Sequence, residues 1–218
     1  MPGLGRLPSP DPEDHNYRMA ALLPPMEQVQ RTSRYWFEGG WFGDQGETSQ
    51  CVEYAWHHWV QAGPVKPRGL GPYWERGSVY EEAKRIDEWP GEDYDGTSVR
   101  AGAKVLQSLG YVDSYHWAWD IDTLVNALLT AGPVVVGTLW TSDMFMPSRE
   151  GIAKPTGYEV GGHAYLATGI NLNHGLIRFK NSWGRQWGRT GRFRMAIEDF
   201  EKLLLMDGEA CLALEKDG

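Results

Sequence analysis

The sequence predicts an α+β protein whose first half is mainly helical and whose second half is mainly β. Helical periodicity recurs between residues 51 and 132, whereas short apolar strand patterns recur between 133 and 216. This segregation is typical of α+β folds, in which helices and an antiparallel sheet come from different parts of the chain. The 218 residues suffice for one large domain or two joined halves. A cleft between the halves is the natural place for an active site.

A proline-rich arm is expected over residues 1–28, followed by a domain over 29–218. Its prolines exclude a long helix; they are Pro2, Pro8, Pro10, Pro12, Pro24 and Pro25. Residues 29–132 are expected to be mainly helical and 133–218 mainly β. The arm lacks the apolar segment of a signal peptide. A cytoplasmic or virion-associated protein is therefore expected over a classically secreted one.

The first helix is expected from Cys51 to about residue 62, because apolar residues recur there at three- and four-residue spacing until Gly63 and Pro64. Three more helices are expected, over about 78–87, 97–110 and 120–132. Ser98 or Thr97 is the expected N-cap of the third helix. Strands are expected at 133–140, 163–170, 175–181, 192–197 and 211–216, with a hairpin turn at "NLNHG".

Charge and composition disfavour several classes of protein. The net charge of −8 is unsuited to binding nucleic acid through phosphate contacts. No apolar stretch approaches the ~20 residues of a membrane span. The chain has only two cysteines and no CxxC or Cys/His cluster, so neither a structural zinc site nor a disulfide framework is expected. The adjacent His57 and His58 point about 100° apart on a helix, which disfavours a metal site. No cofactor is expected.

Cys51 stands where a loop meets a helix, which suits a nucleophile. The thiolate is the reactive form, and a free cysteine has a pKa of about 8.5. A helix N-terminus stabilises an anion by at most about 2 kcal/mol, or roughly 1.5 pKa units. A strongly activated thiol therefore needs an imidazolium partner as well. Cys211 alternates within an apolar strand and is expected to be a packing residue.

His163 has the most suitable setting among the six histidines. His57 and His58 lie about 10 Å along the same helix as Cys51 and are too far to pair with it. The others are in the arm, a hairpin turn or a packing context. His163 follows two glycines at the start of a strand, and Asn181 ends a strand 18 residues later. An asparagine can accept the imidazole N–H and fix its tautomer, and the neighbouring Trp183 could shield that bond from water.

Three motifs in this order resemble the papain-like (C1) cysteine peptidases, including bacterial and phage-type members. They are the step from Gln45 to Cys51, the strand "GGHAYLATGI" and the stretch "KNSWGRQWGRTGRFRM". The third is the most specific. "DGTSVRAGAKVLQSLGYV" also resembles a helix of bacterial and phage-type members, and the resemblance covers about residues 40–215. It implies a papain-like fold, with a β-barrel-like second half and the active site between the halves.

The chain departs from the family pattern near the cysteine. Thr48 replaces the family's first cysteine, so the usual disulfide cannot form. Val52 replaces the tryptophan after the nucleophile, and Gln50 stands where a small residue is usual. The interval from Cys51 to His163 is 112 residues, which is short for the family. These departures affect the expected substrate range and regulation, but they remove no catalytic group.

The resemblance implies a role for each matching residue. Cys51 would be the nucleophile, His163 the base and Asn181 its orienting partner, with a resting thiolate–imidazolium pair. The Gln45 amide and the Cys51 backbone N–H would form the oxyanion hole. The substrate-binding residues would be Gly96, Thr97, Gly137, Gly161, Gly162 and Trp183. The pocket for the second residue before the scissile bond, lined by residues 95–97, Gly137 and Gly161, is expected to be wide and to accept bulky apolar or aromatic side chains.

The expected function is thiol-dependent hydrolysis of peptide bonds, with a peptide or protein as substrate. Two alternatives stay open. One is another thiol acyl-transfer enzyme, such as an amidase or a transglutaminase-like enzyme. The other is an idle or blocked papain-like domain that serves as a binding module, for example in a phage particle or a bacterial complex, so a larger assembly is possible. The arm is expected to wrap the domain and stabilise it rather than inhibit it.

Overall fold

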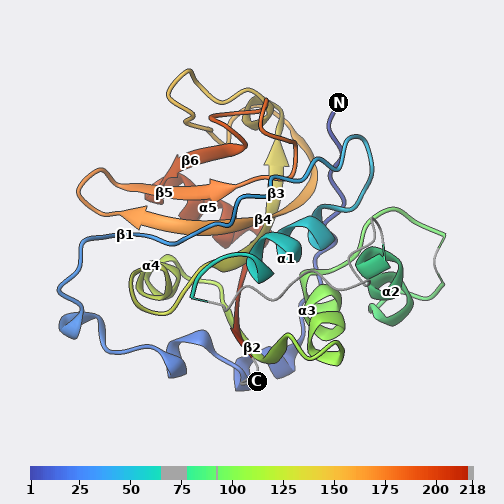
Figure 1. Ribbon diagram of the computed structural model, residues 1–218, viewed down its shortest axis with the longest axis horizontal. Coiled ribbons are helices and arrows are strands. Elements are labelled where there is room, and N and C mark those ends of the chain that lie inside the picture. The colour runs from blue at the N-terminus through green and yellow to red at the C-terminus, as the bar shows by residue number, and fades with distance from the viewer. Residues whose placement is uncertain (65–77, 92, 216–218) are drawn as a thin grey trace.

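The computed structural model describes residues 1–64, 78–91 and 93–215 (Figure 1). An antiparallel sheet of seven strands has helices packed on both faces, with the strand order β2-β7-β3-β4-β5-β6 and β1 paired to β4. Its strands are β1 (Ser33–Tyr35), β2 (Val112–Ala118), β3 (Val134–Thr141), β4 (Glu159–Asn171), β5 (Leu176–Lys180), β6 (Arg192–Ala196) and β7 (Glu209–Glu215). The five strands predicted in the second half are thereby confirmed, except that residue 216 lies outside the described residues.

All four predicted helices are present: α1 (Cys51–Val60), α2 (Ser78–Ile86), α3 (Val99–Ser108) and α4 (Ile121–Thr130). Ser98 caps α3, and its hydroxyl accepts a hydrogen bond from the Ala101 amide. Gly102 lets α3 pack closely on α1, because a Cβ there would lie 2.4 Å from the Trp56 ring. No described helix is long and apolar enough to span a membrane.

The division into a helical half and a β half is less strict than predicted. Strand β2 lies within the segment expected to be mainly helical and pairs with β7. With β1, which pairs with β4, the first half therefore supplies two strands of the sheet. Helix α5 (Ile197–Asp207), which the sequence analysis did not identify, follows directly on β6. Helix α4 packs into the core beside β3 and β4 rather than against α1 and α3. Long-range packing therefore decides which half an element joins.

Two hydrophobic cores result. One lies around α4, α5 and strands β3 to β6, and the other lies around α1, α2, α3 and the β7 side of the sheet. The two cores meet along β4, which contacts both α1 and α4. The Ala164 side chain of β4 belongs to the α1 core, whereas its neighbour Tyr165 belongs to the other core. Residues near the middle of β4 therefore stand at the boundary between the halves.

The arm contains only short 3-10 helices, η1 (Pro12–Asn16), η2 (Met19–Leu22) and η3 (Met26–Gln28). In Figure 1 it starts near the beginning of α1 and passes beneath α3 and α4 to reach β1. A buried ion pair between Asp14 and Arg100 attaches it to α3. The Asn126 amide of α4 donates to the Pro24 carbonyl at 2.8 Å. These contacts agree with the expectation that the arm wraps the domain.

One more short 3-10 helix, η5 (Ser142–Phe145), follows β3 outside the arm.

Candidate active site

Cys51 is the first residue of α1 and is completely buried. Its Sγ accepts a hydrogen bond from the Ala164 amide at 3.4 Å. Because Ala164 directly follows His163 in β4, this contact brings the thiol beside the predicted base. The position of Cys51 at a helix start is as predicted, and the backbone N–H groups of Cys51 and Val52 favour its thiolate.

His163 and Asn181 are hydrogen bonded, as their motifs predicted. The Nε2 atom of His163 lies 2.7 Å from Asn181 Oδ1, and both side chains are fully buried. Since the amide oxygen can only accept, Nε2 carries the hydrogen and Nδ1 is left as the free ring nitrogen. His163 Nδ1 has no hydrogen-bond partner among the described residues. The ring is thus held by one nitrogen, and the other is available for proton transfer.

Two indoles enclose the imidazole. Trp183 stacks on His163 at 4.7 Å between ring centroids, and Trp140 meets the same ring edge-on at 4.9 Å. Trp183 is 5% exposed and Trp140 is fully buried, so these rings keep water from the His163–Asn181 hydrogen bond. The sequence analysis expected this shielding from Trp183. It did not identify Trp140, which comes from β3.

Gln45 is held in one orientation by the loop that carries Asn181. The Ser182 hydroxyl donates to Gln45 Oε1 at 2.6 Å, and the Ser182 backbone N–H donates to Asn181 Oδ1 at 2.8 Å. With its oxygen engaged, the Gln45 amide directs Nε2 to two carbonyls, those of Thr48 at 2.6 Å and Leu4 at 3.2 Å. Ser182 is therefore a positioning residue that the sequence analysis did not single out, although it lies inside the most specific motif.

Residues 3–7, termed the cleft segment, lie across these side chains. At one end the Gly3 amide donates to the Gly46 carbonyl at 2.7 Å, and Trp183 Nε1 donates to the Gly3 carbonyl at 3.1 Å. At the other end, Thr97 donates to the Gly5 carbonyl and accepts from the Leu7 amide, both at 2.9 Å. The cleft segment thus connects the Gln45 loop with the start of α3.

The glycines predicted to bind substrate make room for this segment. A Cβ on Gly162 would lie 2.1 Å from the Arg6 carbonyl oxygen, and one on Gly96 would lie 2.4 Å from the Gly5 oxygen. A Cβ on Gly161 would lie 3.1 Å from Leu4 Cδ1. The Gly162 carbonyl accepts the amides of both Gly5 and Arg6 at 3.0 Å. The backbone at these glycines therefore forms the wall of a groove in which a peptide backbone can lie in close contact.

The remaining predicted substrate residue, Gly137, faces a charged group that the sequence analysis missed. Arg6 enters beside Gly137, and its Nε donates to Glu209 Oε1 at 2.9 Å. The Arg6 side chain is 2% exposed and that of Glu209 is 8% exposed. Glu209 starts β7, directly opposite Gly137 in β3. No sequence motif marks Glu209, because only strand pairing brings residue 209 to this groove.

Burial favours the neutral forms of Cys51 and His163 in this conformation. It raises the pKa of Cys51 to about 12, although the Ala164 amide opposes this. It also lowers the pKa of His163 to about 4, against the opposing effect of Asn181. The expected thiolate–imidazolium pair is therefore not the favoured state while the cleft segment covers the site. The physical reason is desolvation, which penalises both charged forms.

The other residues considered as functional have structural environments. Among the described residues, no group of three or more His, Cys, Asp or Glu side chains could hold a metal. His57 stacks on Trp41 at 3.9 Å, and His58 Nε2 accepts the Gly43 amide at 3.5 Å. Cys211 is buried in the α1-side core, which agrees with its predicted packing role.

Comparison with known proteins gives a consistent result. Residues 40–210 match the papain family of cysteine proteases. The crystal structure of xylellain, a cysteine protease from Xylella fastidiosa, superposes with a TM-score of 0.74 at 20% identity, over 97% of this chain and 96% of that one. A Carica candamarcensis cysteine protease in complex with E-64 has a TM-score of 0.63 at 17% identity, over 86% and 100% of the two chains. These two likenesses concern the fold.

Curated relatives match over parts of their length. A peptidase C1-like protein of Acanthamoeba polyphaga mimivirus is 26% identical over 197 residues, which cover 70% of this chain and 63% of that protein. A cathepsin B-like protein of Giardia intestinalis, CP2, is 41% identical over 80 residues, or 35% of this chain and 26% of that protein. The chain thus spans less than two thirds of each of these relatives.

Proposed function

Because the chain belongs to the papain family of cysteine proteases, we propose that it hydrolyses peptide bonds with Cys51 as the nucleophile. The observation that carries this proposal is the arrangement of His163. Its Nε2 is bound to Asn181, its Nδ1 has no partner among the described residues, and the next residue in the strand contacts the Cys51 thiol. A base fixed in this way can accept a proton from the thiol.

The proposed reaction proceeds through a thioester. The Cys51 proton passes to His163 Nδ1, and Sγ attacks the scissile carbonyl carbon. The oxygen that becomes negative is stabilised by Gln45 Nε2 and the Cys51 backbone N–H. His163 then gives its proton to the departing amine, and the C–N bond breaks. Water attacks the thioester while His163 takes up its proton, and the acid product leaves as that proton returns to Cys51.

The cleft segment occupies the groove without presenting a cleavable bond. By resemblance to the family, a substrate places the residue two before the scissile bond near Thr97 and Gly137, and its scissile carbonyl near Gln45. In the cleft segment the Leu4 carbonyl is near Gln45, whereas Arg6, which follows Leu4, is beside Gly137. The segment therefore runs opposite to the expected substrate direction. It must leave the groove before a substrate can bind, so this part of the arm would inhibit the enzyme, contrary to the expectation of a purely stabilising arm.

The occupied groove also supports the alternative of a blocked domain, in which the cleft segment never leaves. A test with the full chain separates the two. We expect denatured casein to be cut under reducing conditions, with new amino termini found by mass spectrometry. Cys51→Ala and His163→Ala should abolish cutting, whereas Cys211→Ala, which changes the other buried thiol, should retain it.

Other outcomes of that test identify the alternatives. Release of ammonia or formation of isopeptide bonds without new amino termini would indicate a different acyl-transfer enzyme. If casein stays intact both with the wild type and with Arg6→Ala, in which the cleft segment is loosened, the peptidase function is excluded. The blocked binding domain would then be the remaining alternative.

A further inference from the structure

The pocket that holds Arg6 is built for a positive charge. Besides the bond to Glu209, the Arg6 guanidinium donates to the Asp207 carboxylate at 3.1 Å and to the Asp207 carbonyl at 2.7 Å. Three oxygen acceptors thus converge on one side chain. The absence of a side chain at Gly137 leaves room for it, since a Cβ there would lie 2.8 Å from Arg6 Nε and 2.9 Å from Glu209 Oε1.

An apolar guest would fit this pocket poorly. Burial raises the pKa of Glu209, and the charge of Arg6 opposes that shift. If an apolar side chain replaced Arg6, the carboxylate would remain desolvated without its hydrogen-bond donor, which costs free energy. Water could enter only if the guest left part of the pocket empty. The acceptors therefore favour a long side chain that ends in a cation.

We propose that Glu209 makes this enzyme select peptides with arginine or lysine two residues before the scissile bond. The inference rests on the proposed peptidase function and replaces the expectation of a bulky apolar or aromatic residue at that position. Arginine is the better guest, because its guanidinium can reach both Glu209 and Asp207, as Arg6 does. The substrate class is then a basic protein segment, in keeping with the overall charge of −8.

The test compares pairs of peptides that differ only at this position, with arginine or leucine, on the full chain. Both peptides compete with the same cleft segment, so the ratio of their kcat/KM values reports the pocket alone. We expect arginine to be preferred, and Glu209→Gln to reduce the ratio by about 10- to 100-fold, the worth of a charge-assisted hydrogen bond. Glu201→Gln, at an exposed position of α5, is the matched control and should leave the ratio unchanged.

The outcomes separate this inference from the proposed function. Cleavage with leucine equal to or better than arginine would overturn the selectivity while leaving the peptidase intact. If neither peptide is cut, protection of Cys51 from iodoacetamide measures binding without turnover. Equal protection of Cys51 by the two peptides would then overturn the pocket assignment. The assignment would stand if the arginine peptide protects Cys51 more strongly than the leucine peptide and this difference disappears in Glu209→Gln.

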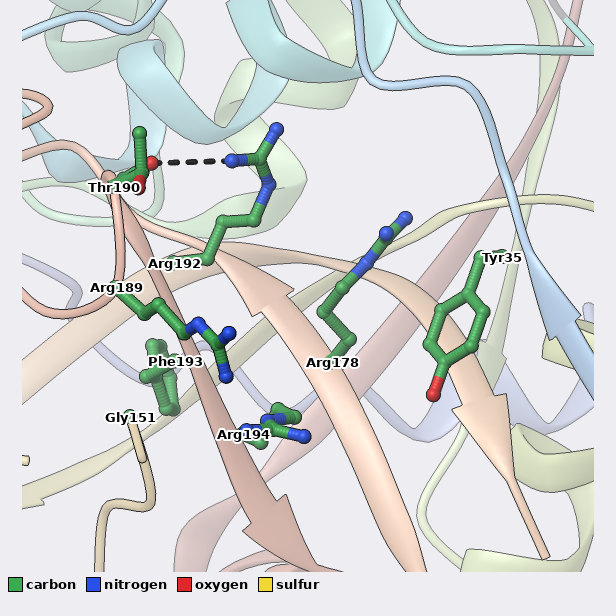
Figure 2. Close-up of a pocket in the computed structure, with 8 residues that line it drawn as sticks. All are labelled: Tyr35, Gly151, Arg178, Arg189, Thr190, Arg192, Phe193 and Arg194. Atoms are coloured by element: carbon green, nitrogen blue, oxygen red, sulfur yellow. Dashed lines mark hydrogen bonds between the residues drawn. The ribbon is translucent and has the colours of Figure 1, made fainter. Parts of the chain in front are cut away.

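A second site is indicated on the outer face of β5 and β6, where a cavity of about 350 Å³ is lined by four arginines. The four arginines are Arg178, Arg189, Arg192 and Arg194 (Figure 2), and none of the lining residues is a proposed catalytic residue. Residues 176–197 contain six Lys or Arg and no Asp or Glu, in a chain of net charge −8. Positive charge is therefore concentrated in this segment, which supplies all four arginines of the cavity.

The arginines of this cavity are only partly neutralised. Arg178 and Arg192 form ion pairs with the buried Glu38, at 2.7 and 2.5 Å. Arg194 donates to the Glu150 carbonyl at 2.5 Å. The Arg189 guanidinium has no hydrogen-bond or salt-bridge partner in the described part of the chain, and Figure 2 shows it directed into the cavity on the side of Arg194. With Glu38 and the exposed Glu150 counted, four positive charges face two negative ones.

The geometry points to a binding site for a phosphate or sulfate group between Arg189 and Arg194. Guanidinium groups bind such oxyanions through paired charge-assisted hydrogen bonds. Neither arginine is bound to a carboxylate through a salt bridge in the described residues, so an anion would not have to displace one. The cavity volume of about 350 Å³ suits a compact anion carried on a larger ligand.

Calorimetric titration of the full chain at low salt tests this site, with inorganic phosphate, inorganic sulfate and heparin as probes. Binding of phosphate without binding of sulfate or heparin would indicate that the natural ligand is phosphorylated. Preferential binding of sulfate and heparin would indicate that it is sulfated. Arg189→Ala should weaken binding at least about tenfold, whereas Arg85→Ala, an exposed arginine of α2, should not. No binding of any probe, or equal binding by the two variants, would overturn the site.

Discussion

Replacing Arg6 should open the active site, because this side chain is the buried anchor of the cleft segment. In Arg6→Ala the Glu209 carboxylate loses its donor at 2.9 Å, and although water can enter the space left by the side chain, no cation then faces the carboxylate in the closed conformation. Removing one partner of a buried ion pair costs about 3–5 kcal/mol. That cost falls on the closed conformation, since Glu209 regains water when the segment leaves. At about 1.4 kcal/mol per tenfold change, the opening equilibrium should shift by about 100-fold or more.

Alkylation of Cys51 measures this opening. Burial raises the pKa of the thiol to about 12 in the closed conformation, so the thiolate is scarce at pH 7.5 and reaction proceeds mainly through the open one. We therefore expect iodoacetamide to label Cys51 about 100-fold faster in Arg6→Ala than in the wild type, as followed by mass spectrometry of the Cys51 peptide. The acceleration of labelling has an upper limit, because the rate cannot rise further once the cleft segment is open most of the time.

Cys211 provides an internal control for the fold as a whole, since it is equally buried, in the core beside α1. Faster labelling of Cys51 with Cys211 unchanged would show local opening. Labelling of Cys51 within about threefold of the wild type would refute the reasoning. So would a parallel rise at both cysteines, because it would mean that the whole fold had been weakened.

Three further predictions concern the same groove. Gly162→Ala should also accelerate Cys51 alkylation, because the three atoms nearest to the added Cβ all belong to Arg6; unchanged labelling would contradict the close approach. Gln45→Ala should lower kcat by about 10²–10³ with a smaller effect on KM, measured on a peptide substrate, since one oxyanion donor is lost. Burial lowers the pKa of His163 to about 4, so the folded chain binds fewer protons than the unfolded chain between pH 4 and 6.5. The free energy of unfolding should thus rise with pH across that window, and urea titrations at pH 4.5 and 6.5 should show a smaller difference in His163→Gln.

Much of the fold could be predicted from local pattern. Helices α1, α3 and α4 have apolar periodicity and clear end signals, and the structure places them within two residues of the predicted limits at most ends. Strand β2 was missed because its aromatic residues gave no clear alternation. Its β structure depends on pairing with β7, almost one hundred residues further along the chain. Helix α5 was missed because it follows β6 directly, so no turn residues separate the strand pattern from the helix pattern.

The proposed catalytic residues could be predicted for a different reason. Cys51, His163 and Asn181 each lie in a short motif whose residues are adjacent in sequence. In the structure His163 is hydrogen bonded to Asn181, and the Ala164 amide beside it contacts the Cys51 thiol. Glu209 and Arg6 have no such motif. They meet across 203 positions, and their ion pair depends on a strand pairing that no local pattern encodes. The prediction of a pocket for apolar side chains therefore rested on the glycines of its walls. It did not take account of the Glu209 carboxylate, which the sequence analysis had not identified.

Three consecutive residues of strand β4 have three different roles at the site. The Gly162 carbonyl binds the cleft segment, His163 is the proposed base, and the Ala164 amide contacts the thiol. All three depend on one alignment with β3, in which His163 is opposite Thr138. Because a shift of one residue turns every side chain to the other face of a sheet, a single insertion or deletion in this strand would disturb groove, base and nucleophile together. Substitutions along β4 can change these roles separately, but changes of length cannot.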